Sequence, residues 1–89
     1  MAFRVRCEVR SAEFRRYREG QSKDGKTRLY CKFEDFDGND FEVSVNDPNL
    51  VASCRSLVKG QVCDLDVLCN ATTDYSFVAL LSEPMLLSE

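Results

Sequence analysis

The sequence predicts an all-β protein, a small barrel of five strands with one short helix between the third and fourth strands. Apolar and polar side chains alternate along several runs, which is typical of strands with one buried face. Two Asp-Gly pairs, at 24–25 and 37–38, indicate tight turns between antiparallel strands. One segment instead carries apolar residues at helical spacing. In a chain of 89 residues, these elements predict one domain over 1–89.

The first strand is predicted from residue 3 to about residue 10, where every second side chain is apolar: Phe3, Val5, Cys7 and Val9. The next segment, 11–19, has two interpretations. A helix would use Ser11 as its cap and Gly20 as its stop, whereas a strand would continue the first one through a bend. We favour the strand, because the strand predicted near 27–34 needs a long partner.

The second and third strands are separated by the Asp37-Gly38 turn. Their apolar positions alternate with polar ones and are Leu29, Cys31, Phe33, Phe41, Val43 and Val45. Because the turns on both sides of the second strand are short, we expect the first three strands to form an antiparallel meander.

The second half of the chain supplies the helix and two more strands. Asp47 fits the cap of a helix and Pro48 its first position. Apolar residues then recur at helical spacing before Gly60, so we expect a helix near 49–58. The fourth strand has an apolar face made by Cys63, Leu65, Val67 and Cys69. The last strand, 75–81, is apolar on both faces.

Three strands, a helix and two strands is the order of the OB-fold, a five-stranded Greek-key barrel that binds oligonucleotides or oligosaccharides on its outer face. An unrelated small β-barrel, or a five-stranded sheet with a helix on one side, has the same element order. We favour the OB-fold.

Residue types argue against an enzyme or a metalloprotein. The chain has no histidine, and its five cysteines include no C-x-x-C pair. Most of these cysteines occupy apolar strand positions, where we expect buried, reduced thiols and no cofactor or metal. The N-terminal residues are too charged for a signal peptide and no run is long enough to span a membrane, so we expect a cytoplasmic protein.

Charge is divided unevenly along the chain. Residues 1–32 carry ten basic and four acidic side chains, a net charge of +6. Residues 33–89 carry two basic and eleven acidic side chains, a net charge of −9. A positive surface on an acidic protein favours binding of a polyanion at one face.

The alternation predicts where that surface lies. If the first two strands pair, the outward Arg4, Arg6 and Arg10 lie beside the outward residues of the second strand. Cations there would follow phosphates, and tyrosines would stack on unpaired bases. Our candidate nucleic-acid-binding residues are Arg6, Arg16, Tyr17, Arg18, Lys23, Lys26, Arg28, Tyr30 and Lys32. The alternative is a solvated face whose arginines pair with the chain's own acids.

Three short motifs support this interpretation: AEF at 12–14, REGQSKDGK at 18–26 and GNDFEV at 38–43. Here the chain resembles the single-stranded DNA-binding proteins of the filamentous-phage gene V type. The resemblance implies an OB-type barrel, a homodimer and cooperative coating of single strands during phage replication. It also implies that Arg18 and Lys23 contact phosphate and that Phe36 stacks on a base. Arg28 departs from the family pattern, which has an aromatic residue there.

We therefore predict a protein that binds single-stranded nucleic acid, with DNA favoured over RNA. We expect no enzymatic activity, no cofactor and no association with a membrane. The apolar segment 75–81 and the tail Met85-Leu86-Leu87 predict a homodimer. One alternative is an OB-like module that binds a replication or recombination protein. Another is a structural barrel subunit with no nucleic-acid contact.

Overall fold

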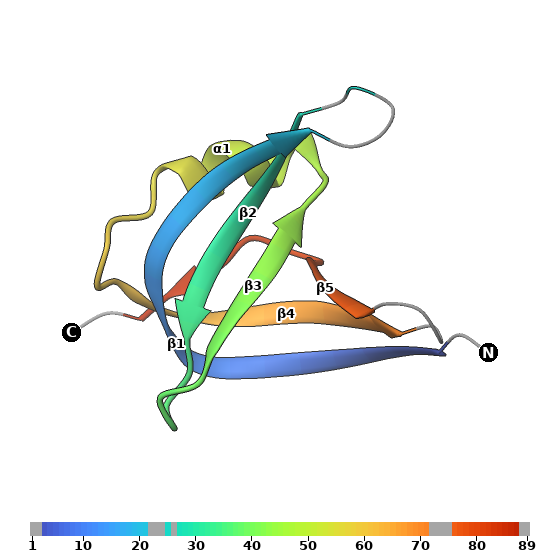
Figure 1. Ribbon diagram of the computed structural model, residues 1–89. Helices are drawn as coiled ribbons and strands as arrows, with labels where there is room; N and C mark the ends of the chain where they lie inside the picture. Colours follow the sequence, from blue (N-terminus) through green and yellow to red (C-terminus); the bar gives the residue numbers. More distant parts are fainter. Residues whose placement is uncertain (1–2, 22–24, 26, 72–75, 88–89) are drawn as a thin grey trace.

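The computed structural model describes residues 3–21, 25, 27–71 and 76–87. Its elements, in chain order, are β1 (Phe3–Gln21), β2 (Thr27–Glu34), β3 (Asp40–Val45), α1 (Pro48–Arg55), β4 (Val62–Ala71), β5 (Ser76–Leu80) and β6 (Met85–Leu86). The first five strands form a barrel with the single helix between β3 and β4 (Figure 1). The predicted OB-fold is confirmed, and β6 is a short addition that the sequence did not predict.

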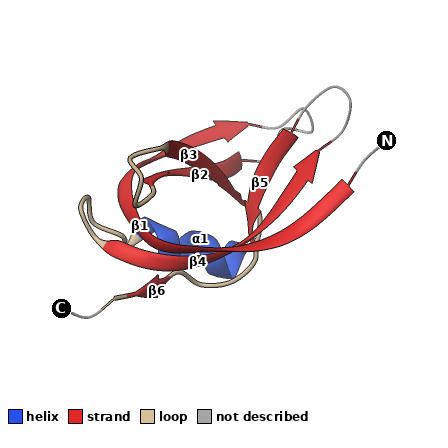
Figure 2. Cartoon of the chain, turned by 90° about the horizontal axis from the view of Figure 1, so that it is seen from below, coloured by secondary structure: helices blue, strands red, loops and turns tan. Residues whose placement is uncertain are grey.

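The barrel closes because β1 is long enough to pair with two strands. Its first half is antiparallel to β4, and its second half is antiparallel to β2. On the other side, β3 meets β5 through a short parallel pairing of Ser44 with Ala79. Figure 2 shows the strands curving round a closed ring, with α1 across one end of it. The two halves of β1 therefore belong to different parts of the barrel wall.

The sharp bend of β1 is centred on Ser11. This residue has a φ of 58°, in the left-handed region that side chains other than glycine seldom adopt. Its backbone N–H leaves the strand ladder and donates to Asp64 Oδ1 at 3.0 Å. The pairing with β4 shifts between Val9 and Ala12, as in a β-bulge. Residues 11–19 are thus strand, as we favoured, and the carboxylate of Asp64 supports the bend.

The core fills the ring with side chains from every barrel strand. Phe33 is 1% exposed and lies at its centre, with its ring centroid 5.7 Å from Phe14 and 5.9 Å from Phe41. α1 and the segment after it add Cys54 and Leu57. Contacts of this kind between close-packed aromatic rings supply much of the stability of a small domain.

The cysteines are free thiols, as expected. Cys31, Cys54 and Cys63 are buried, whereas Cys7 and Cys69 are half-buried. Burial raises the pKa of Cys63 to about 11. The pKa of Cys31 is also raised, first by its hydrogen bond with Cys54 and then by burial. Both thiols therefore stay protonated at neutral pH and act as small apolar groups.

Two element boundaries differ from the prediction. The helix begins at Pro48, with the Asp47 carboxylate accepting from the N–H of Asn49, but it ends at Arg55 rather than near residue 58. The hydroxyl of Ser56 donates to the carbonyl of Ser53 at 2.7 Å and helps to end the last turn. The final barrel strand, Ser76–Leu80, ends one residue before the predicted residue 81, and the predicted start at residue 75 lies outside the described residues. Within the described chain, α1 is neither long nor apolar enough to cross a membrane.

Candidate nucleic-acid interface

The candidate surface is the outer face of the second half of β1 and of β2. Here Arg16 lies opposite Lys32, Arg18 opposite Tyr30, and Gly20 opposite Arg28. Directly opposed residues share one face of a sheet, and the intervening Leu29 and Cys31 are buried. We call this surface the β2 face, and its side chains are those of Arg16, Arg18, Arg28, Tyr30 and Lys32.

Tyr17 does not belong to the β2 face. It lies opposite Cys31, whose side chain is buried, so it points to the inner side of the sheet. Its ring is 44% exposed at the barrel margin, 6.5 Å from the ring of Phe14, and the guanidinium of Arg55 lies 5.9 Å from it. The prediction that Tyr17 and Tyr30 share one surface is wrong, because Tyr17 lies between Arg16 and Arg18 in a regular stretch of strand and so points to the opposite face from them.

Arg6 is also displaced from the predicted surface. It lies opposite Leu68 of β4, and Arg4 lies opposite Asn70. The bend at Ser11 causes this separation, because β2 pairs with β1 only from Glu13 onward. The expected row of Arg4, Arg6 and the outward residues of β2 is therefore a wrong prediction of strand pairing.

Phe36 is displayed at the tip of the turn between β2 and β3. It is 88% exposed, which is unusual for so large an apolar side chain. The carboxylate of Asp35 holds this turn by accepting from the N–H groups of Asp37 and Asn39, at 3.0 and 2.8 Å. Phe36 is not among the side chains of the β2 face, and it lines a hollow together with Ser11 at the bend of β1. The remaining candidates, Lys23 and Lys26, lie outside the described residues.

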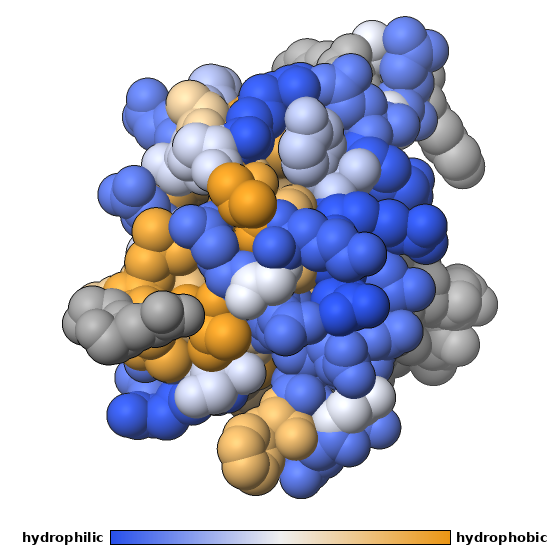
Figure 3. Space-filling view, turned by 90° about the vertical axis from the view of Figure 1, so that its left-hand side faces the viewer, coloured by the Kyte–Doolittle hydropathy of each residue, from blue (hydrophilic) through white to orange (hydrophobic). Residues whose placement is uncertain are grey.

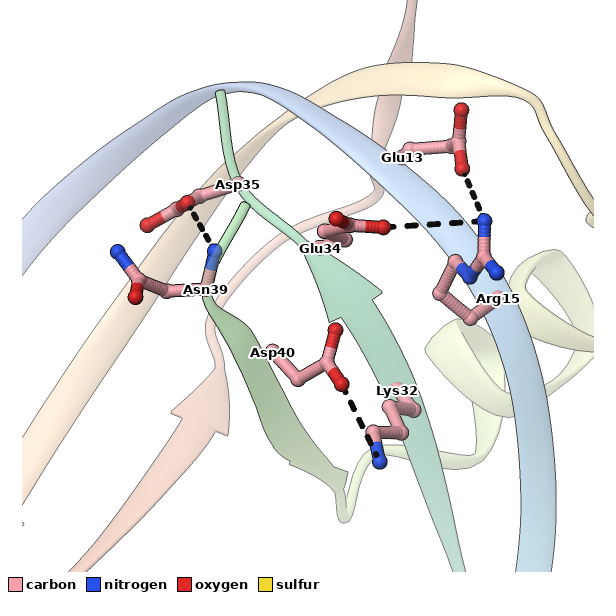
Figure 4. Close-up of polar contacts among 7 residues, drawn as sticks. All are labelled: Glu13, Arg15, Lys32, Glu34, Asp35, Asn39 and Asp40. Carbon is pink, nitrogen blue, oxygen red and sulfur yellow. Dashed lines mark hydrogen bonds and ion pairs between the residues drawn. The ribbon is translucent and has the colours of Figure 1, made fainter. Parts of the chain in front are cut away.

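The acidic row of β3 neutralises part of the β2 face. Glu42 lies opposite Lys32 in the sheet and accepts two hydrogen bonds from Arg18, at 2.6 and 2.9 Å. Lys32 Nζ lies 3.6 Å from Asp40 Oδ2, and Figure 4 marks this ion pair. The hydrogen bond from Arg18 is the main cause that lowers the pKa of Glu42, so this carboxylate is ionised at neutral pH. The self-pairing alternative thus holds for Arg18 and Lys32.

Other cations of the face keep their charge available. Arg16 and Arg28 form no ion pair with any residue that the structure describes. Arg16 borders an open hollow of about 470 Å³ whose other lining residues are Arg15, Lys32, Glu34, Gly38, Asp40 and Lys59. Four of its seven lining residues are basic and two are acidic, which leaves it positive and polar, as an anion subsite needs.

Sequence reasoning missed Lys59 as a neighbour of this hollow. The residue follows α1 and stands far along the chain from β1. Backbone hydrogen bonds hold the connection against β1, because Gly60 N–H donates to the carbonyl of Phe14 at 2.9 Å and Phe14 N–H donates to that of Gln61 at 2.8 Å. Arg15, the bulged residue of β1, is instead neutralised by Glu13 at 2.6 Å and Glu34 at 3.7 Å (Figure 4).

Tyr30 is the aromatic centre of the β2 face. Its side chain is half-buried, and its ring lies close to the backbone of β1 at Gly20. A Cβ added at Gly20 would come within 3.1 Å of Tyr30 Cε2, so the glycine makes this close approach possible. The guanidinium carbon of Arg18 lies 4.3 Å from the ring centroid, a cation–π distance.

The wall formed by β4 and the first half of β1 has mixed charge, because the exposed Arg4 and Arg6 share it with an acidic cluster. Glu8 of β1 lies opposite Asp66 of β4, and a hollow of about 300 Å³ there is lined by these residues with Asp64 and Glu83. Arg10 partly compensates this acidity through its ion pair with Glu8. No group of three His, Cys, Asp or Glu side chains within the described ranges is placed to hold a metal ion.

One solved structure has a closely similar fold. The mitochondrial single-stranded DNA binding protein Rim1 of S. cerevisiae superposes with a TM-score of 0.70, at 17% sequence identity, over 93% of this chain and 93% of that chain. No protein-family model and no curated protein matches the sequence. The likeness therefore concerns the fold, and the predicted likeness to the gene V type is not confirmed.

Proposed function

We propose that this chain binds single-stranded nucleic acid, DNA in preference to RNA, across the β2 face. One observation carries the proposal: Arg16 and Arg28, unpaired among the described residues, lie on the same outer sheet face as the ring of Tyr30. Guanidinium groups neutralise phosphates, and a tyrosine ring offers a platform for an unpaired base. OB barrels bind oligonucleotides on the face of their second and third strands, and β2 is one of these two. The fold likeness to a single-stranded DNA binding protein supports the proposal.

The same proposal includes a second copy of the chain and a role in replication. Met85, Leu86 and Leu87 are 67%, 52% and 41% exposed, and Figure 3 shows an apolar patch on this otherwise largely hydrophilic side of the molecule. Burial of such a patch between two chains would form a homodimer. We propose the cytoplasm as its location. The motifs at 18–26 and 38–43 support a role in coating single strands during replication of a phage or mobile element.

Fluorescence anisotropy of a labelled oligo-dT at several salt concentrations tests the binding. We expect affinity to fall with salt, with a log–log slope of about −0.7 for each phosphate contacted. Unlabelled duplex DNA should compete less well than oligo-dT, because its bases are not free to stack. An absence of binding at low salt, or affinity that is independent of salt, would overturn the proposal and favour the protein-interaction module.

A further inference from the structure

In the free protein, the ring of Tyr30 is already covered. Arg18 starts from β1, opposite Tyr30, and its guanidinium carbon lies 4.3 Å from the ring centroid. Beyond the ring, its Nε and Nη2 donate to the two carboxylate oxygens of Glu42 on β3, at 2.9 and 2.6 Å. The Arg18 side chain therefore spans three strands, and one carboxylate holds it over the aromatic face.

This arrangement occupies the groups that a nucleic acid would use. The Nε and Nη2 groups that donate to Glu42 form one of the two edges by which a guanidinium binds phosphate with paired hydrogen bonds, and Glu42 occupies that edge. The ring face beneath it is a surface on which a base would stack. A Cβ at Gly20 would lie 3.1 Å from Tyr30 Cε2 and 3.4 Å from Arg18 Nη1, so this glycine leaves room for both the ring and the guanidinium. In the free protein, Arg18 therefore already contacts both Glu42 and the Tyr30 ring, with no ligand present.

We propose that Glu42 is an internal competitor of the nucleic acid, which a bound strand displaces by giving a phosphate to Arg18 and a base to Tyr30. The inference rests on the proposed function. Glu42 is then a residue that sets affinity without touching the ligand. The ion pair is partly solvent-exposed, with 56% of the Arg18 side chain and 39% of the Glu42 side chain accessible. Replacing Glu42 by a phosphate on Arg18 therefore costs little free energy.

A matched pair of substitutions separates this role from a general effect of charge. Glu42→Gln and Glu8→Gln each remove one negative charge and each release one arginine, since Glu8 pairs with Arg10 at 3.2 Å. Glu8 lies on the part of β1 that pairs with β4, away from Tyr30. We expect Glu42→Gln to bind oligo-dT about three- to tenfold more tightly than the unsubstituted chain, and Glu8→Gln to stay within about twofold of it.

The outcomes distinguish the inference from the proposed function. An equal gain in both variants, or no gain in Glu42→Gln while the unsubstituted chain binds, overturns the inference and leaves the proposed function standing. No binding by any of the three proteins overturns the proposed function itself. A thermal melt of each variant confirms that the comparison is made on folded protein.

Photo-crosslinking adds a second readout that a structural role for Glu42 would not change. An oligomer carrying 5-iododeoxyuridine reacts with an aromatic ring on which its base is stacked. We expect a crosslink at Tyr30 in saturated complexes of both the unsubstituted chain and Glu42→Gln. A saturated complex that crosslinks elsewhere but not at Tyr30 would show that Arg18 stays on the ring, and the inference would fail.

Discussion

Tyr30→Ala and Arg28→Ala should weaken binding of a single strand in two different ways. Removing the Tyr30 ring removes a stacking platform, which is worth about 1–3 kcal/mol per base. In this structure part of that gain is offset, because a base must replace Arg18 and its cation–π contact of about 0.5–1 kcal/mol. We therefore expect a net loss of about 0.5–2 kcal/mol, or about two- to thirtyfold in Kd.

The salt dependence separates the two variants. Tyr30→Ala should leave the log–log slope nearly unchanged, because stacking releases no counterions. Arg28→Ala should make the slope shallower by about 0.7, which is the contribution of one phosphate contact on a single strand. Arg10→Ala is the matched control, because it removes the same charge from the part of β1 that pairs with β4.

Anisotropy titrations of oligo-dT at four or more salt concentrations measure both quantities. The Tyr30 side chain is outward and half-buried, so we expect Tyr30→Ala to remain folded with little change in Tm. The reasoning fails if Tyr30→Ala shifts the slope as much as Arg28→Ala does. It also fails if Arg10→Ala weakens binding as strongly as Arg28→Ala.

Three further predictions concern stability and assembly. Phe33→Ala should lower the free energy of unfolding by about 3–5 kcal/mol in urea titrations, because it removes a ring that is 1% exposed between Phe14 and Phe41. The pKa of Glu42 is lowered, mainly by Arg18 and further by the charges of Lys32 and Arg16, so its stabilising effect is present above the ordinary carboxyl pKa and is lost as the pH falls through the lowered value. The Tm difference between the unsubstituted chain and Glu42→Gln should therefore shrink as the pH is lowered, and a difference independent of pH would contradict the assigned ion pair. Light scattering should report about twice the 10.2 kDa chain mass, whereas a monomer at high concentration would refute the homodimer.

Alternation in the sequence was sufficient to predict the barrel strands and the faces of β2 and β3. Leu29, Cys31 and Phe33 are buried, as their spacing predicts, because a strand has a side-chain period of two. The Asp47-Pro48 pair likewise placed the start of the helix. These features depend only on residues close together in the chain, so local patterns are enough.

Pairing and side-chain contacts over long separations were not predictable in the same way. Alternation shows which face a residue occupies but not which strand lies beside it, so the pairing of β1 with β2 was predicted but its pairing with β4 was missed. The left-handed backbone at Ser11 and the bulge after Phe14 each reverse which alternate residues of β1 face the core. Neither feature can be predicted from the residue types at these positions. The contact of Arg18 with Glu42 joins residues 24 positions apart and depends on the register of three strands.

Amide chemical-shift mapping tests the central claim most directly, that the β2 face is the binding surface for single strands. A ¹⁵N-labelled chain would be titrated with oligo-dT at low salt. We predict that the largest shifts fall on the strand segments that carry Arg16, Arg18, Arg28, Tyr30 and Lys32, with small changes at the acidic Glu8 and Asp66. Shifts centred on the part of the wall formed by β4 and the first half of β1, or no shifts at saturating oligomer, would contradict the account.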